Sequence, residues 1–328
     1  MFAGLLNKGF RGSLLLLILL FLLAATVNYL SVQAPESYHY PDLFYNYFTR
    51  EIGNKFIINS LNFLCIGLGI LLVSLTISNQ EIIDKQNYFP AFLYALVCIA
   101  AVNPFQISPQ LFTNLFVLYA LYRLFDIYRQ EDVLKSIFQA AFWLSLSAYL
   151  TVASCIFFPL FFIALMILRP FHWREWAVAL LGFLCTLFFY ESLAYLFDWN
   201  HWFLFDSIQM YLHYLRFPTF SEYFLPLLAF LFVLLLLSLF NNFRYGFGNT
   251  VKKQRAKSVF LWMLFFDLFG FFAAGSNSSG ILSLYAVPLC FLTGDFFFSI
   301  RQTKVSNTLL SLLILCVVLV VMGKLGLV

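Results

Sequence analysis

The chain has 328 residues, of which 62% are hydrophobic and only 10% are charged. A soluble domain carries roughly 25% charged residues because its surface must face water, so this composition excludes an ordinary water-soluble fold. The formal net charge of +4 is small, and the basic residues lie between apolar runs, which indicates membrane topology and not a nucleic-acid partner. The composition therefore predicts an all-α polytopic transmembrane bundle without a soluble domain.

Uninterrupted apolar runs mark the spans in chain order. A helix needs roughly 20 residues, or as few as about 17, to cross the hydrocarbon layer. The runs predict about eleven spans within one integral membrane domain, residues 1–328: 13–32, 55–78, 88–103, 110–125, 137–152, 154–168, 177–197, 224–241, 259–274, 280–299 and 307–323.

Two of these assignments have alternatives. The run 13–32 is longer than the apolar core of a signal peptide, about 7–15 residues, so we expect a retained helix. The runs 137–152 and 154–168 are separated by almost nothing, and Pro159 introduces a possible kink, so a re-entrant hairpin is the alternative to two full spans.

The distribution of basic residues predicts the orientation. With a cytoplasmic N-terminus, fifteen of the 19 Lys and Arg residues fall on the cytoplasmic side and four, Arg50, Lys55, Arg216 and Lys324, fall outside. This bias predicts a bacterial inner-membrane protein with a periplasmic C-terminus. The cluster Lys252, Lys253, Arg255 and Lys257 is interpreted as part of this topology signal.

Two long outer loops, 33–54 and 198–223, collect most of the outer charges. Glu36 and Asp42 are acids in the first loop, and we expect the two aromatic-rich loops to pack together around a groove that reaches Asp42. A carboxylate there could activate an acceptor hydroxyl or hold a divalent cation, while Arg50, Lys55 and Arg216 neutralise a lipid-linked phosphate. The alternative is that these are ordinary loop charges.

Histidine and cysteine spacing predicts no metal site. The six cysteines stand singly in apolar stretches, and the four histidines do not share a helix face: His39, His172, His201 and His213.

Three acids fall inside or near the predicted spans, where charge is costly and often functional. Asp267 is nearest the middle of its span, and we expect a neutral carboxylic acid hydrogen-bonded to Tyr285, Ser283 or Asn62. Glu191 lies near the outer end of its span. Asp295 lies near an inner end, where cytoplasmic water or Arg301 is in reach.

The segment Arg169-Pro170-Phe171-His172-Trp173-Arg174-Glu175-Trp176, here called the elbow, joins two apolar spans. Trp173 and Trp176 are three residues apart and should share a helix face. Arg169 and Arg174 can contact lipid phosphates, so the elbow is interpreted as an interfacial anchor.

At the elbow the sequence resembles an uncharacterised family of multi-pass inner-membrane proteins from Bacteroidetes-type bacteria. In that family an RPFxWREW-like box follows a Phe-rich helix and precedes a helix with a glycine, as Gly182 does here. The resemblance covers most of the chain, including Asn103-Pro104 and Asn114-Leu115-Phe116. It implies a multi-helix membrane architecture and no particular activity.

In layout the sequence is also similar to polyprenyl-phosphate-sugar-dependent glycosyltransferases of the multi-helix type. The shared features are an inside N-terminus, a long first outer loop with an acid and an interfacial helix, and a segment like 103–109 before a helix. The similarity implies that Asp42 occupies the catalytic acidic position. The chain departs from that pattern in lacking an adjacent acidic pair in the loop and a soluble C-terminal domain.

Three functions follow as hypotheses. The first is an envelope-glycan protein, glycosyltransferase- or polymerase-like, that acts on a polyprenyl-phosphate-linked sugar at the periplasmic face. The second is a non-enzymatic scaffold or subunit of an envelope complex. The third is a transporter or flippase that uses Asp267 and Glu191 within the membrane. Membrane lipids are the partners common to all three.

Overall fold

The computed structural model describes residues 55–80, 89–102, 108–128, 130–198, 204–206, 208–209, 222–245, 250–273, 278–299 and 303–324. Over these ranges all regular structure is helical, which confirms the all-α class. Each predicted apolar run from 55–78 onward coincides with a helix, whereas the run 13–32 lies outside the described residues.

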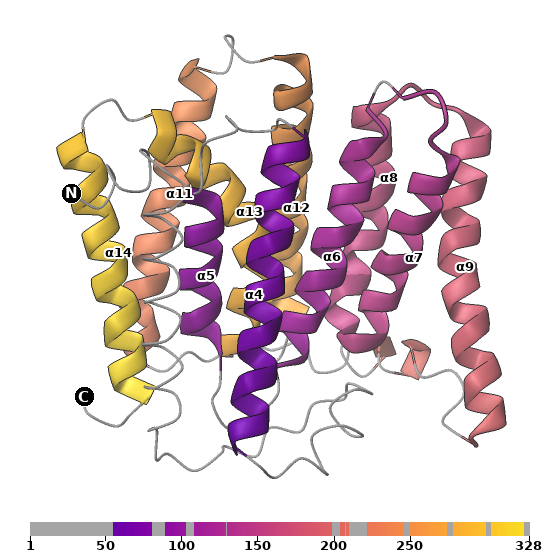
Figure 1. Cartoon of the computed structure of the whole chain (residues 1–328), viewed down its shortest axis with the longest axis horizontal. Coiled ribbons are helices and arrows are strands. Elements are labelled where there is room, and N and C mark those ends of the chain that lie inside the picture. Colours follow the sequence, from indigo (N-terminus) through magenta and orange to yellow (C-terminus); the bar gives the residue numbers. More distant parts are fainter. Residues whose placement is uncertain are drawn as a thin grey trace.

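The helices pack side by side and run alternately in opposite directions (Figure 1). Their bounds are α4 Lys55–Gln80, α5 Phe89–Ala101, α6 Pro109–Asp126, α7 Leu134–Leu150, η1 Val152–Ile156, α8 Phe157–Leu168, α9 Trp173–Leu196, η2 Glu222–Phe224, α11 Leu225–Tyr245, α12 Val251–Ala273, α13 Ser278–Ser299 and α14 Thr303–Lys324. We call the end where α7 and α9 begin the elbow end. The other end, where α4 and α6 begin, is the opposite end.

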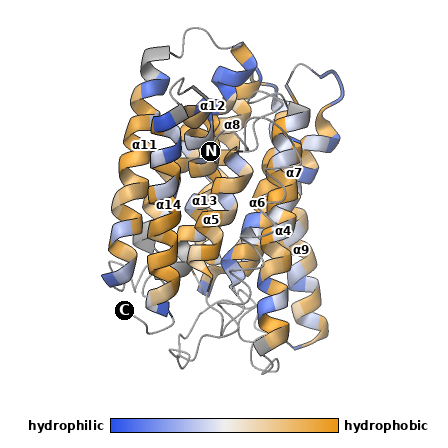
Figure 2. Cartoon of the chain, turned by 60° about the vertical axis from the view of Figure 1, so that its left-hand side comes forward, coloured by the Kyte–Doolittle hydropathy of each residue, from blue (hydrophilic) through white to orange (hydrophobic). Residues whose placement is uncertain are grey.

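Within the part of the chain that the structure describes, four helices are long and apolar enough to cross a membrane: Phe56–Ser78, Trp173–Leu196, Glu222–Asn242 and Lys304–Lys324. Shorter apolar helices cover Phe89–Ala101, Val152–Leu168 and Leu282–Phe297. The outer helices are hydrophobic along their length, with hydrophilic residues gathered toward their ends (Figure 2). This distribution fits a protein whose flanks contact lipid.

Helix α9 buries its small residues and exposes its large ones, the reverse of a water-soluble helix. Ala179, Gly182 and Thr186 are buried, whereas Leu184 and Phe188 are each more than half exposed. A β-carbon added at Gly182 would lie 2.8 Å from the β-carbon of Ala141 on α7. Small residues at this crossing let the two helix backbones approach closely, as membrane helices do when lipid gives no hydrophobic drive to association.

Helix α5 is the central element, because all of its 13 residues are buried. At 1.5 Å per residue it is about 20 Å long, shorter than the hydrocarbon layer. It packs on α13, where the rings of Phe89 and Phe297 stack with centroids 5.5 Å apart. A β-carbon at Gly294 would clash with the ring of Pro90, so the glycine permits this close approach.

Lys324, at the end of α14, caps α5 at the opposite end of the bundle. Its Nζ donates to the carbonyl oxygens of Ala100 and Val102, at 2.6 and 2.5 Å, and lies 5.5 Å from the ring centroid of Phe224. Carbonyls at a helix C-terminus have no intrahelical partner and carry partial negative charge, so a cation stabilises them. The contact ties the last described helix to the centre of the fold.

The segment 137–168 forms two short helices joined by a 3₁₀ turn. Helix α7 ends at Leu150, η1 spans Val152–Ile156, and α8 returns toward the elbow end. Pro159 lies in the first turn of α8, where a missing N–H costs no intrahelical hydrogen bond. It therefore begins a helix and does not kink one.

Asp295 has two partners that the sequence analysis did not name. It forms ion pairs with Lys253, at 2.9 Å, and with Lys257, whereas the expected partner Arg301 lies outside the described residues. Lys257 also donates to Asn242 Oδ1 at 2.7 Å. These pairs form because α12 begins at Val251, before its apolar run, which brings the basic cluster into the bundle. The long lysine stems can pack on apolar neighbours while their ammonium groups reach the acid.

Candidate functional site

Buried polar side chains gather near the opposite end of the bundle. We call them the polar layer: Asn59 and Asn62 on α4, Gln110, Thr113 and Asn114 on α6, Thr151 before η1, Asp267 on α12 and Ser283 on α13. At 1.5 Å per residue, each helical member lies within about 10 Å of the end of its helix. Polar groups buried among apolar helices are costly, which makes the layer the strongest candidate site.

Some members of the layer connect neighbouring helices. Asn62 Oδ1 accepts from the backbone N–H of Ser108 at 3.1 Å, and Asn114 Nδ2 donates to the Ser283 carbonyl at 2.5 Å. The hydroxyls of Thr113 and Thr151 are 2.8 Å apart. These contacts join α4 to the start of α6, α6 to α13, and α6 to the segment after α7. They hold the layer in a fixed arrangement.

Other polar atoms of the layer have no hydrogen-bond partner in the part of the chain that the structure describes. They are both side-chain atoms of Asn59, Oε1 of Gln110 and Oδ1 of Asn114. Asn59 is only 6% exposed and Asn114 only 1%. An amide buried without a partner costs about 1–3 kcal/mol by mutational data, and native proteins keep few such groups. Several of them in one layer indicate a place where a ligand or water completes the hydrogen bonds.

Asp267 belongs to this layer and is 4% exposed. The hydroxyl of Tyr285 donates to the backbone carbonyl of Asp267, at 2.5 Å, and not to its carboxyl group. The carboxyl Oδ2 has no partner among the described residues. Of the three expected partners, Tyr285 therefore contacts Asp267 at its backbone. Asn62 Oδ1 accepts from Ser108, and the Ser283 carbonyl accepts from Asn114.

The chemistry of the layer suits a neutral, hydroxyl-rich group. Each amide presents donors and an acceptor, and a hydroxyl group can both donate and accept. Over the residues that the structure describes, no group of three or more His, Cys, Asp or Glu side chains could hold a metal ion. The layer can therefore donate hydrogen bonds to, and accept them from, a polar ligand or water.

Of the residues predicted to act from the outer loops, the structure describes Lys55. Glu36, Asp42, Arg50 and Arg216 lie outside the described residues, as does most of the loop 198–223. Lys55 is the first residue of α4, so the loop 33–54 joins the chain at the opposite end, one turn before Asn59. Glu191 lies half-buried on α9, at the edge of the bundle.

The elbow forms a second polar constellation, at the other end of the molecule. Arg169 pairs with Glu175 at 3.5 Å and donates to the Gln130 carbonyl at 2.9 Å. Trp176 packs on the rings of Phe162 and Phe171, with centroids 5.1 Å away in each case, whereas Trp173 is 68% exposed. The two tryptophans therefore have different environments, despite their helical spacing.

The sequence carries a signal for the layer that charge-based reasoning overlooked. Asn59 and Asn62 are three residues apart, and Gln110 and Asn114 are four apart, each pair within an apolar run. These spacings place two amides on one helix face. An amide pair at helical spacing inside two different runs would have predicted a polar contact between α4 and α6.

Comparison with known proteins gives a family but no activity. A family described as a family of unknown function (DUF6427) matches residues 43–327, which is most of the chain. No curated protein and no solved structure matches it.

Proposed function

We propose a function for this chain, which belongs to the DUF6427 family, from the positions and chemistry of its own residues. It is a multi-pass protein of a bacterial inner membrane that binds the sugar of a polyprenyl-phosphate-linked glycan in the polar layer and serves envelope glycan assembly. About eleven spans cross the membrane, with the N-terminus in the cytoplasm and the C-terminus in the periplasm.

The orientation rests on the basic residues. The elbow end carries these described Lys and Arg residues: Arg123, Lys135, Arg169, Arg174, Arg244, Lys252, Lys253, Arg255, Lys257 and Lys304. Among the described residues, the opposite end carries Lys55 and Lys324. Since Lys and Arg favour the cytoplasmic side, the elbow end is cytoplasmic and the polar layer is on the periplasmic side.

A cysteine-labelling experiment tests this orientation. In a cysteine-free background, Asn200→Cys should react with a membrane-impermeant maleimide added to the periplasmic side, and Asn249→Cys should react only after the membrane is opened. Labelling of position 249 in intact spheroplasts would contradict the orientation.

The proposal of a sugar ligand rests on the side-chain amide atoms of Asn59, Gln110 and Asn114 that have no hydrogen-bond partner among the described residues. A sugar presents several hydroxyls at spacings that such amides can match, and its polyprenyl chain can lie against the apolar flanks of the helices. The amides carry no charge, so they fit the sugar, while the phosphate needs basic partners near the membrane surface.

In the glycosyl-transfer form of the proposal, the loop before α4 supplies the reactive groups. Asp42, or Glu36, takes the proton of an acceptor hydroxyl group. The oxygen of that hydroxyl attacks the anomeric carbon of the sugar, and the bond between this carbon and the polyprenyl phosphate breaks. Arg50, Lys55 and Arg216 neutralise the leaving phosphate, with or without a divalent cation. This role is supported by the position of Lys55, the first residue of α4, at the same end as the polar layer.

A binding measurement tests the ligand class. The protein in nanodiscs is offered a polyprenyl phosphate with one sugar, or the same lipid without sugar, and bound lipid is counted by native mass spectrometry. We expect the sugar to raise affinity about tenfold, which corresponds to about 1.4 kcal/mol. Asn59→Leu with Gln110→Leu should abolish that preference, and Gln139→Leu on α7, outside the layer, should keep it. Equal binding of the two lipids by the unaltered protein would contradict the proposal.

Asp267 supports a second candidate function, a proton-coupled transporter or flippase. A buried carboxyl group with an oxygen that lacks a described partner can accept and release a proton as a substrate passes. A scaffold, by contrast, needs neither Asp267 nor the unmet amides.

A further inference from the structure

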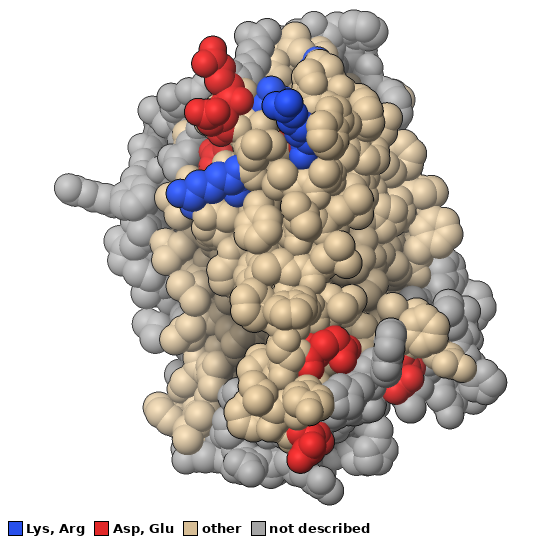
Figure 3. Space-filling model, turned by 90° about the vertical axis from the view of Figure 1, so that its right-hand side faces the viewer, with Lys and Arg blue, Asp and Glu red and all other residues tan. Residues whose placement is uncertain are grey.

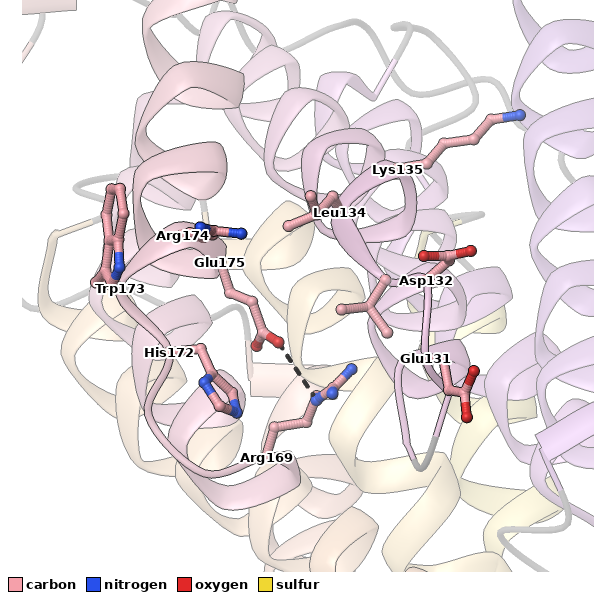
Figure 4. Close-up of a pocket in the computed structure, with 10 residues that line it drawn as sticks. Glu131, Asp132, Leu134, Lys135, Arg169, His172, Trp173, Arg174 and Glu175 are labelled. Carbon is pink, nitrogen blue, oxygen red and sulfur yellow. Dashed lines mark ion pairs between the residues drawn. The ribbon is translucent and has the colours of Figure 1, made fainter.

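A charged pocket lies at the elbow end, far along the helices from the polar layer. Its volume is about 510 Å³, and it lies between the elbow and the segment 131–135 that begins α7. Figure 4 shows Glu131 and Asp132 on one side of this pocket and Arg169, His172 and Arg174 on the other. Apart from Lys135 beside the acids and Glu175 beside the bases, the two signs of charge are therefore separated across the pocket.

The ion pair inside the elbow fixes the basic wall. Arg169 is held by Glu175, which is buried, and by the Gln130 carbonyl. This leaves the exposed His172 and Arg174 to meet a ligand. The guanidinium of Arg174 lies 5.8 Å from the ring centroid of Trp173, and Lys135 lines the pocket on the side of the acids.

Large apolar side chains surround this charged pocket. Trp173 is 68% exposed, Phe171 63% and Leu134 47%. Exposed tryptophan beside arginine is typical of the headgroup level of a membrane. On the face seen in Figure 3, Lys, Arg, Asp and Glu side chains gather toward the two ends, with a broad uncharged band between them. The pocket therefore opens where lipid headgroups lie.

We propose that this pocket binds the headgroup of phosphatidylethanolamine. The ammonium group lies against Glu131 and Asp132, and the phosphodiester lies against Arg174 and His172, which can form charge-assisted hydrogen bonds. The acyl chains then lie against the apolar residues Trp173, Phe171 and Leu134. An anionic headgroup without an amine would leave the two acids unmatched, and a quaternary choline has no N–H to donate to them. The proposal does not depend on the polar layer.

Native mass spectrometry of the full chain tests the site, with phosphatidylethanolamine, phosphatidylcholine and phosphatidylglycerol of identical acyl chains. We expect phosphatidylethanolamine to bind about tenfold tighter than phosphatidylcholine, because its ammonium group makes one more charge-assisted hydrogen bond. The double variant Glu131→Gln, Asp132→Asn should remove that preference. Arg174→Gln should weaken the binding of all three lipids.

Matched controls keep the test specific. Lys304→Gln removes an exposed base at the same end, and Glu222→Gln removes an exposed acid at the opposite end, so both should leave the preference unchanged. Soluble glycerophosphoethanolamine should compete poorly, because it lacks the acyl chains that contact the apolar residues. Equal binding of ethanolamine and choline lipids, an unchanged preference in the acidic double variant, or full competition by the soluble headgroup would each overturn the proposal.

Discussion

Two asparagines on α4 should respond in opposite directions to the same substitution. Asn59 has no hydrogen-bond partner for either side-chain polar atom among the described residues, whereas Asn62 accepts from the Ser108 N–H. Both are buried, at 6% and 0% exposure. Replacing Asn59 by leucine removes two unmet polar atoms and adds apolar contact. Replacing Asn62 by leucine instead leaves a buried N–H without its partner.

The magnitudes follow from the cost of an unmet buried group. Asn59→Leu should raise the free energy of unfolding by about 1–3 kcal/mol, and Asn62→Leu should lower it by about the same amount. At about 2.1 cal/mol/K of unfolding entropy per residue, these changes should move the Tm of this 328-residue chain by about 1–4 °C, upward for the first variant and downward for the second.

The buried cysteine thiols allow the Tm to be measured by thiol labelling. Cys65, Cys98 and Cys290 are free and buried, so a thiol-reactive fluorogenic dye reports unfolding as temperature rises. A fall in Tm for Asn59→Leu as large as that for Asn62→Leu would refute the reasoning. It would show that Asn59 is satisfied within the folded chain and that the polar layer awaits no ligand.

Three further variants test other parts of the account. Asp295→Asn should destabilise the protein by about 3–5 kcal/mol in the same dye assay, because it leaves Lys253 and Lys257 without their acid; an unchanged Tm would contradict the buried pairing. Gly182→Leu should lower the yield of folded protein on size-exclusion chromatography, because its side chain would enter α7 at Ala141; normal yield would mean that the two helices can separate. Asp267→Asn should preserve the membrane level of the protein by immunoblot; function should also persist under the glycan proposal, whereas complete loss at normal level would favour the proton-coupled transporter.

The helices of this chain could be predicted because a long apolar run is a strong local signal. Helix ends were less accurate, since helices continue into charged segments. Helix α12 begins at Val251 and α9 at Trp173, both before the apolar runs that predicted them. Long Lys and Arg stems and an amphipathic Trp are compatible with a helix, yet they interrupt a count of apolar residues.

Pairing between helices could not be predicted, because it depends on which helices are neighbours. Asp295 is close in sequence to Arg301 but packs against α12 and its lysines. The sequence also does not reveal that the Asn59 amide lacks a described hydrogen-bond partner, because an asparagine in an apolar run can face a neighbouring helix, lipid or a ligand. The acids and bases of the long loops were conspicuous by charge, whereas the polar layer is built of uncharged amides.

The most direct test of the central claim is an experimental structure of the protein in nanodiscs with a polyprenyl-phosphate-linked sugar. The account predicts non-protein density in the polar layer, within hydrogen-bond distance of the amide groups of Asn59 and Asn114, with the lipid chain leaving between helices. A polar layer in which protein side chains satisfy every amide, with the lipid bound elsewhere, would contradict it.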